Sequence, residues 1–179
     1  MPRGYSESKR LSELYRLDIL DTDPDPYLDA IVDEAADVTG CPVAVISLID
    51  RSRQWFKARH GLELCQTRRE YAFCAHTIRE RHRLEVLNAA QDPRFADNPF
   101  VTGRLHVRYY AGVPIVSRYG ARIGALCVID RICRDPLPES QWRCLRSGSR
   151  AVTAAIEFGK YRVPLPLIPA PSTPPRQEA

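Results

Sequence analysis

Two pairs of strand-like segments, each joined by a short polar connection, constrain this fold more than any other feature of the chain. The first pair is VAVISLID (43–50) and RQWFKARH (53–60), and the second is HVRYYAGVPIVS (106–117) and ARIGALCVID (121–130). β-Branched and aromatic runs with such connections are typical of β-hairpins. The last run is apolar at both parities, which predicts a central strand covered on both faces. The sequence therefore predicts an antiparallel sheet.

Amphipathic helices are expected at both ends of the chain. Leucines recur at every third position from Leu11 to Leu20, and a second apolar stripe runs through PYLDAIVDEAADVTG (26–40) until Gly40 ends it. The segment 138–162 carries apolar residues near a/d spacing, which predicts a long final helix.

The middle of the chain contains shorter elements. Residues 72–81 read as a helix and 84–90 as a short strand. Residues 91–103 read as an irregular loop with one helical turn, because Asp-Pro, Asn-Pro and Gly recur there. Strands and helices do not alternate as they would in a doubly wound parallel fold. Hairpins with segregated helices favour an antiparallel sheet of the α+β class.

Length and composition fit one domain. At 179 residues, 44% hydrophobic and 27% charged, the chain has enough apolar material for a core. We expect an N-terminal helix in 1–20, the folded domain in 21–160 and a disordered proline-rich tail in 161–179. The start of the chain has no apolar signal region, and the apolar runs are too short to span a membrane. These features predict a cytoplasmic protein.

Charge and cysteine patterns narrow the function classes. The net charge of +4 comes from arginines spread along the chain among many acids, which favours a solvated surface over a nucleic-acid track. Six cysteines occur without an export signal or a Cys-x-x-Cys pair. We therefore expect reduced thiols and neither a disulfide framework nor a zinc site.

The stretch EYAFCAHTIRE (70–80) places Cys74 two positions before His76. On a helix, side chains two apart point about 200° apart, so the pair cannot chelate one metal ion. We expect one side chain to turn into the interior and the other toward a neighbouring strand or loop. Cys74 near a helix N-terminus has the setting of a reactive thiol, with Cys65 as a partner, but a small buried cysteine and a core histidine also fit. Cys127, inside the predicted central strand, is expected to be inert.

The loop DPRFADNPFVTG (92–103) is the second candidate site. It gathers charged and amide side chains beside two phenylalanines, and loops that cover a sheet often bind ligands. The same sequence is also expected where aspartates and asparagines cap turns and the phenylalanines pack into the core. On the following strand, Tyr109 and Tyr110 face opposite ways, so one of them faces the cavity side. We assign no residue a catalytic or metal-binding role. The candidate ligand-binding residues are Phe73, Cys74, His76, Asp92, Arg94, Phe95, Asn98, Tyr109 and Tyr110.

These segments together resemble a GAF domain, the small-molecule-sensing module of signalling proteins, and most closely the GAF domains of bacterial sensor histidine kinases and diguanylate cyclases. The resemblance covers residues 20–131, extends through the final helix to Phe158, and is carried by YAFCAHTI, LEVLNAAQDPRFADNPFVTG, VRYYAGVPI and GARIGALCVIDR. It implies an antiparallel sheet of five or six strands, with terminal helices on one face. It implies a ligand cavity on the other face, bordered by FCAHTI and DPRFADNPF, and a homodimer through the terminal helices.

The resemblance leads us to expect a stand-alone, non-catalytic regulatory domain. No output segment follows Phe158 in this sequence, so a signal would pass to a separate partner, such as a histidine kinase or cyclase acting in trans. The small-molecule ligand and any cofactor are unknown. The Asn-Lys-Phe-Asp-Glu pattern of cyclic-nucleotide-binding relatives and the adjacent Cys-His of bilin-binding relatives are missing.

Two alternatives stay open. The first is a thiol enzyme resembling free methionine-(R)-sulfoxide reductase. Cys65 and Cys74 lie near two of its thiol positions, but the loop around Gly103 lacks the cysteine that attacks the sulfoxide. The second is a dimerisation module that binds no ligand.

Overall fold

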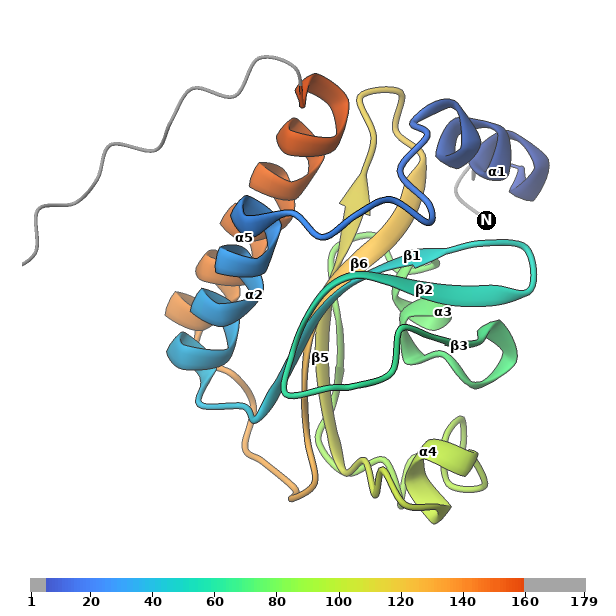
Figure 1. The fold of residues 1–179 in the computed structure, drawn as a ribbon. Coiled ribbons are helices and arrows are strands. Elements are labelled where there is room, and N and C mark those ends of the chain that lie inside the picture. Colours follow the sequence, from blue (N-terminus) through green and yellow to red (C-terminus); the bar gives the residue numbers. More distant parts are fainter. Residues whose placement is uncertain (1–5, 160–179) are drawn as a thin grey trace, which may run out of the picture.

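The computed structural model describes residues 6–159, so the predicted tail (161–179) lies outside the described residues. Six strands form one antiparallel sheet with the order β3-β2-β1-β6-β5-β4, and the fold is α+β, as predicted (Figure 1). The strands are β1 (Val43–Ile49), β2 (Arg53–His60), β3 (Gln66–Arg68), β4 (Leu84–Val86), β5 (Tyr109–Val116) and β6 (Arg122–Asp130). The helices are α1 (Glu7–Arg16), α2 (Pro26–Thr39), the 3-10 helix η1 (Arg69–Tyr71), α3 (Phe73–Thr77), α4 (Pro99–Thr102) and α5 (Glu139–Phe158).

Two hairpins form the centre of the sheet. β1 pairs with β2 and β5 pairs with β6, as the sequence predicts, and β1 also pairs with β6. β6 therefore lies between β1 and β5 and joins the two hairpins into one sheet. Its residues 123–128 are all buried, which confirms the prediction of a strand covered on both faces.

Helices α2 and α5 pack side by side against one face of the sheet (Figure 1). α2 starts at Pro26 behind an Asp25 cap and ends at Gly40, whose φ of 64° lies in the left-handed region that favours glycine. Alternate side chains of the central strands meet these helices in an apolar core. The largest buried members of that core include Leu14, Leu28, Ile46, Tyr109, Leu126 and Trp142.

Helix α3 and the loop that follows β4 cover the opposite face of the sheet (Figure 1). The strand residues on this face have the other parity, because successive side chains of a strand point to opposite sides. A second apolar core results, which includes Val45, Phe56, Phe73, Phe95, Tyr110 and Cys127.

Helix α1 touches both layers through polar contacts. It packs against β6, and Arg16 pairs with Glu157 of α5 at 3.1 Å. On the other side, Glu7 pairs with Arg69 of η1 at 2.6 Å. Tyr15 donates a hydrogen bond of 2.7 Å to Asp50, at the end of β1. The apolar partner of α5 is α2, whereas α1 is attached to the domain by these polar contacts together with the buried side chains of Leu11 and Leu14.

Three short elements differ from the sequence prediction. Helix α3 is shorter than 72–81 because residues 79–83 are exposed and offer no apolar contact that would extend it. Strand β4 stops at Val86 although a strand was predicted to residue 90. Strand β3 was not predicted, since QTR has no apolar pattern and forms through its pairing with β2. No helix among residues 6–159 combines the length and apolar character needed to cross a membrane.

Candidate functional site

An apolar cavity of about 60 Å³ lies between the sheet and the α3 layer. Its sheet wall is formed by residues of β1, β2, β5 and β6, which the backbone ladder holds in place. Its cover consists of α3 and of residues in the connecting segments at 61–67 and 100–107. Three leucines of these segments, Leu62, Leu64 and Leu105, are partly or largely exposed to solvent. The cavity thus has one rigid wall and one wall of loop residues.

Cys74 lies at the centre of a buried polar cluster beside the cavity. Its Sγ lies 3.5 Å from Sγ of Cys127 and accepts a hydrogen bond from Tyr110 Oη at 3.3 Å. The hydroxyl groups of Tyr110 and Thr77 are 2.5 Å apart. All four residues are buried. Cys127, which was predicted to be inert, is therefore the thiol next to Cys74.

Cys65, the partner considered for Cys74 from the sequence, lies elsewhere. It is exposed, and its Sγ lies 2.7 Å from a guanidinium nitrogen of Arg59. The nine-residue spacing between Cys65 and Cys74 does not bring the two thiols into contact, because β3 and η1 intervene and α3 turns Cys74 inward.

The buried thiols and phenol differ in their tendency to ionise. Burial opposes ionisation of Cys74, but hydrogen bonds from Cys127, Ser47 and Tyr110 outweigh it and lower the pKa of the Cys74 thiol. Burial and the neighbouring Cys74 raise the pKa of Cys127 and that of Tyr110. Cys74 is therefore the group of this cluster that ionises first.

Aromatic contacts hold α3 in place over the cavity. Phe73 stacks on Phe95 with ring centroids 4.0 Å apart, and it also contacts Tyr110 at 5.2 Å. The ring of His76 meets the edge of Phe95 at 4.8 Å. Cys74 and His76 point in different directions, as expected for positions two apart on a helix: Cys74 faces the interior and His76 the surface beside Phe95.

The polar residues of the 92–103 loop contact one another and the neighbouring backbone. Asp92 pairs with Arg94 at 2.6 Å. Asn98 Oδ1 accepts from Phe100 N at the start of α4, and its Nδ2 donates to the carbonyl oxygen of Tyr71. These residues act as turn and helix caps in the structure, and neither Asp92, Arg94 nor Asn98 lines the cavity.

Tyr109 and Tyr110 lie on opposite faces of β5, as predicted. Tyr110 faces the cavity, whereas Tyr109 is buried in the α2–α5 core and donates a hydrogen bond of 2.8 Å to Glu85. Burial and then Glu85 raise the pKa of Tyr109. Of the candidate ligand-binding residues, the structure brings Phe73, Cys74 and Tyr110 together at the cavity and places Tyr109 away from it.

A second, larger depression opens on the surface beside α3. It has a volume of about 640 Å³, and we call it the arginine pocket. The residues that line it are Arg51, Ser52, Arg68, Arg69, Glu70, Ala75, His76 and Arg79. Among residues 6–159, no group of three or more His, Cys, Asp or Glu side chains is placed to hold a metal ion. Sequence reasoning missed this pocket because its arginines come from separate segments.

Solved structures with the same fold include GAF domains and a reductase. The GAF domain of an Acinetobacter phosphoenolpyruvate-protein phosphotransferase superposes with a TM-score of 0.59 and 20% identity, covering 84% of this chain and 94% of that one. The free methionine-R-sulfoxide reductase of Neisseria meningitidis, solved with its substrate, superposes with a TM-score of 0.58 and 15% identity, covering 86% and 89%. At these identities the likeness shows the fold alone.

A relative in sequence is the cyclic di-GMP phosphodiesterase of Pseudomonas aeruginosa. It is 39% identical over 155 residues, which cover 87% of this chain and 26% of the phosphodiesterase. The chain thus spans about a quarter of that relative's length. The sequence profile of the GAF domain matches residues 23–156, from just before α2 into the last turn of α5. The chain belongs to the GAF domain family.

Proposed function

We propose that this GAF domain is a regulatory module that binds a small molecule in the cavity beneath α3. The observation that carries the proposal is the cavity's construction: an apolar, ladder-held wall faces a cover of loop leucines, and a thiol and a phenol point inward. Apolar pockets with a few convergent polar groups are the usual form of a small-molecule site.

The size of the cavity implies a moving part. Ligand pockets typically have volumes of about 300–1,000 Å³, and this one has about 60 Å³. A metabolite therefore has to displace the cover formed by Leu62, Leu64 and Leu105. A ligand that binds only the opened form shifts the population of open and closed states, and a difference of about 1.4 kcal/mol changes their ratio tenfold. In this proposal, opening of the cover is the conformational change on which regulation depends.

The output we propose is control of a separate signalling domain, in the same polypeptide or in a partner such as a histidine kinase or cyclase. The similarity to one region of a cyclic di-GMP phosphodiesterase favours turnover of that second messenger as the regulated step. The domain itself is proposed to be non-catalytic. A homodimer through the terminal helices is part of the proposal, and the exposed side chain of Phe158 on α5 supports it.

Thermal unfolding with candidate ligands tests the proposal. Nucleotides, amino acids, nitrate and tetrapyrroles are added to the purified domain, and a ligand at about 100 times its Kd is expected to add about 2.7 kcal/mol to the free energy of unfolding. The larger side chain in Leu64→Trp should block the cavity and abolish this gain in the free energy of unfolding. Leu87→Trp is the matched control, because Leu87 is exposed to 40% and Leu64 to 42% but only Leu64 lines the cavity. Equal stabilisation of both variants, or a flat screen, contradicts the proposal.

A thiol reductase is the second candidate, favoured by the contact between Cys74 and Cys127 beside the cavity. The absence of a sulfoxide-attacking cysteine near Gly103, the residue that caps the end of α4, argues against a reductase. Turnover of free methionine sulfoxide with a thioredoxin system decides between the two. We expect none; turnover that disappears in Cys74→Ser would replace the regulatory proposal with an enzymatic one.

A further inference from the structure

The arginine pocket gathers cationic groups from three parts of the chain. Arg51 comes from the turn between β1 and β2, Arg68 and Arg69 from the end of β3 and the start of η1, and His76 and Arg79 from α3 and the turn after it. Its volume of about 640 Å³ falls in the range of small-molecule sites, about 300–1,000 Å³. Ala75, which is buried, forms an apolar part of its floor.

Acidic groups neutralise only part of this charge. Glu70 pairs with Arg68 at 3.1 Å, and Glu7 of α1 pairs with Arg69 at 2.6 Å. Among the described residues, no carboxylate lies within ion-pair distance of Arg51 or Arg79. Glu70 is the single acid that lines the pocket, against four arginines and His76. The pocket therefore has a surplus of positive charge.

His76 lies close to part of this charge. Burial lowers the pKa of its imidazole, and Arg79 and Arg94 lower it further, against the opposing effect of Asp92 and Glu80. An anion placed between Arg79 and His76 would relieve this repulsion, since opposite charges within about 4–6 Å favour the charged form.

We propose that the arginine pocket binds a small anion that carries a phosphoryl group and that this group competes with the Glu7 carboxylate for Arg69. Guanidinium groups bind phosphate oxygens with paired N–H donors, and several of them converge here. A surface depression with Glu70 in its lining and Glu7 beside Arg69 fits a compact anion better than a long polyanion, whose charges would meet these carboxylates. The site is separate from the apolar cavity and goes beyond the function proposed for it.

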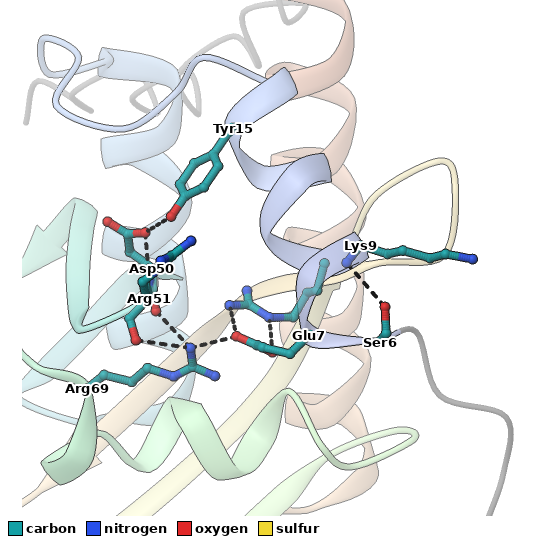
Figure 2. Close-up of polar contacts among 8 residues, drawn as sticks. Ser6, Glu7, Lys9, Tyr15, Asp50, Arg51 and Arg69 are labelled. Carbon is teal, nitrogen blue, oxygen red and sulfur yellow. Dashed lines mark hydrogen bonds and ion pairs between the residues drawn. The ribbon is translucent and has the colours of Figure 1, made fainter.

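The proposed competition connects the pocket to α1. Figure 2 shows Glu7 reaching Arg69 from the first turn of α1. Arg69 also donates to the carbonyl oxygens of Asp50 and Arg51 at 3.0 and 3.3 Å, so its guanidinium stays in place when Glu7 leaves. Glu7 keeps its bonds to Arg10. An anion in the pocket therefore removes one of the few polar contacts that attach α1 to the α3 side of the domain.

Isothermal titration of the domain with pyrophosphate at low ionic strength tests the site. Arg51→Gln and Arg79→Gln remove cations without an ion-pair partner and should each weaken binding about tenfold, which corresponds to loss of one charge-assisted interaction of about 1.4 kcal/mol. Arg143→Gln, an exposed arginine of α5 on the opposite face, removes the same charge and should change the affinity less than twofold. Loss of affinity in all three variants alike would show nonspecific attraction and overturn the proposal.

The competition has its own test. Glu7→Gln should tighten pyrophosphate binding several-fold, because Arg69 then loses its carboxylate partner. Glu34→Gln on α2 removes the same charge far from the pocket and should leave the affinity unchanged. Equal effects of the two variants would overturn the competition with Glu7, and absence of pyrophosphate binding would overturn the site.

Two further binding measurements identify the source of the phosphoryl group and distinguish this site from the cavity. Inorganic phosphate that binds as well as a nucleoside diphosphate would identify phosphate itself as the ligand, and tighter diphosphate binding would identify a nucleotide. Leu64→Trp should bind pyrophosphate like the unaltered domain, so failure of the cavity proposal leaves this one standing. Weakened binding in Leu64→Trp would place the anion in the cavity and contradict the arginine pocket.

Discussion

Phe73 and Phe95 stack face to face, with an angle of 11° between their rings. Phe73 belongs to α3 and lines the cavity, whereas Phe95 belongs to the loop after β4 and is 1% exposed. The contact fastens the two covering segments to each other. The sequence alone could not predict this contact, because the two residues lie 22 positions apart and share no periodic pattern.

Truncation of Phe95 should therefore destabilise the domain strongly. We expect Phe95→Ala to lower the free energy of unfolding by about 3–5 kcal/mol, because a buried ring is removed and its space is left empty. Phe100→Ala should cost less, since Phe100 is only partly buried and meets Tyr71 edge-on. Urea unfolding followed by circular dichroism measures both. A smaller loss in Phe95→Ala than in Phe100→Ala would contradict the packing role.

The two adjacent tyrosines should respond differently to loss of the hydroxyl group. Tyr109→Phe leaves the Glu85 carboxylate without one donor and should cost about 1.5–3 kcal/mol, the range for hydrogen bonds to charged groups. Tyr110→Phe removes weaker bonds to Cys74 and Thr77 and should cost about 0.5–1.5 kcal/mol. Chemical denaturation of the pair gives the ranking, and the reverse order would show that the buried thiol cluster depends on Tyr110 more than the geometry implies.

Thiol accessibility should separate the cysteines into two groups. Cys65 and Cys133 are exposed, so they should react rapidly with a maleimide in the folded domain. Cys41, Cys74 and Cys127 are buried and should react only after unfolding. Peptide mass mapping after brief labelling identifies the sites. Rapid labelling of Cys74 in the absence of ligand would mean that the cavity cover opens frequently by itself.

The Glu7 ion pairs should make stability depend on pH. Hydrogen bonds from Arg10, opposed by burial and reinforced by Arg69, lower the pKa of Glu7 from 4.5 to about 2. Because the folded-state pKa is the lower one, the stabilisation is present above pH 4.5 and is lost as the pH falls toward about 2. Glu7→Gln lacks it at every pH.

Unfolding midpoints of the domain and of Glu7→Gln at pH 7, 4 and 3 measure this effect. The difference between the two proteins should be largest at pH 7 and should shrink at pH 3. A difference that stays constant with pH would show that Glu7 is not held in the charged form by Arg10 and Arg69. Other paired carboxylates act on both proteins and cancel in the comparison.

The strongest parts of the sequence pattern predicted the centre of the fold. The hairpins around β1 and β6 and the cap at Gly40 follow from local residue chemistry, and the structure has them where expected. Strand β3 has no such pattern, because its three polar residues become a strand only through pairing with Arg53, Gln54 and Trp55 of β2. Pairing between segments is information that a local pattern does not contain.

The candidate site was predicted less completely for the same reason. Alternation along β5 shows that Tyr109 and Tyr110 face apart, but which face holds the cavity depends on where α3 packs. The contact of Cys74 with Cys127 joins a helix to a strand 53 positions away. The arginine pocket likewise forms only when the β1–β2 turn, η1 and α3 come together. Motif reasoning identified residues near the site, and the fold determined which of them meet.

The sheet ends on both sides in a strand of three residues, β3 at one margin and β4 at the other. Edge strands this short expose few unpaired amide and carbonyl groups, so a strand of another molecule has few groups with which to pair. The central strands are long and apolar enough to nucleate cross-β stacking. They lie between β3 and β4 and not at the margin of the sheet. The short edge strands therefore limit strand addition between copies of this domain.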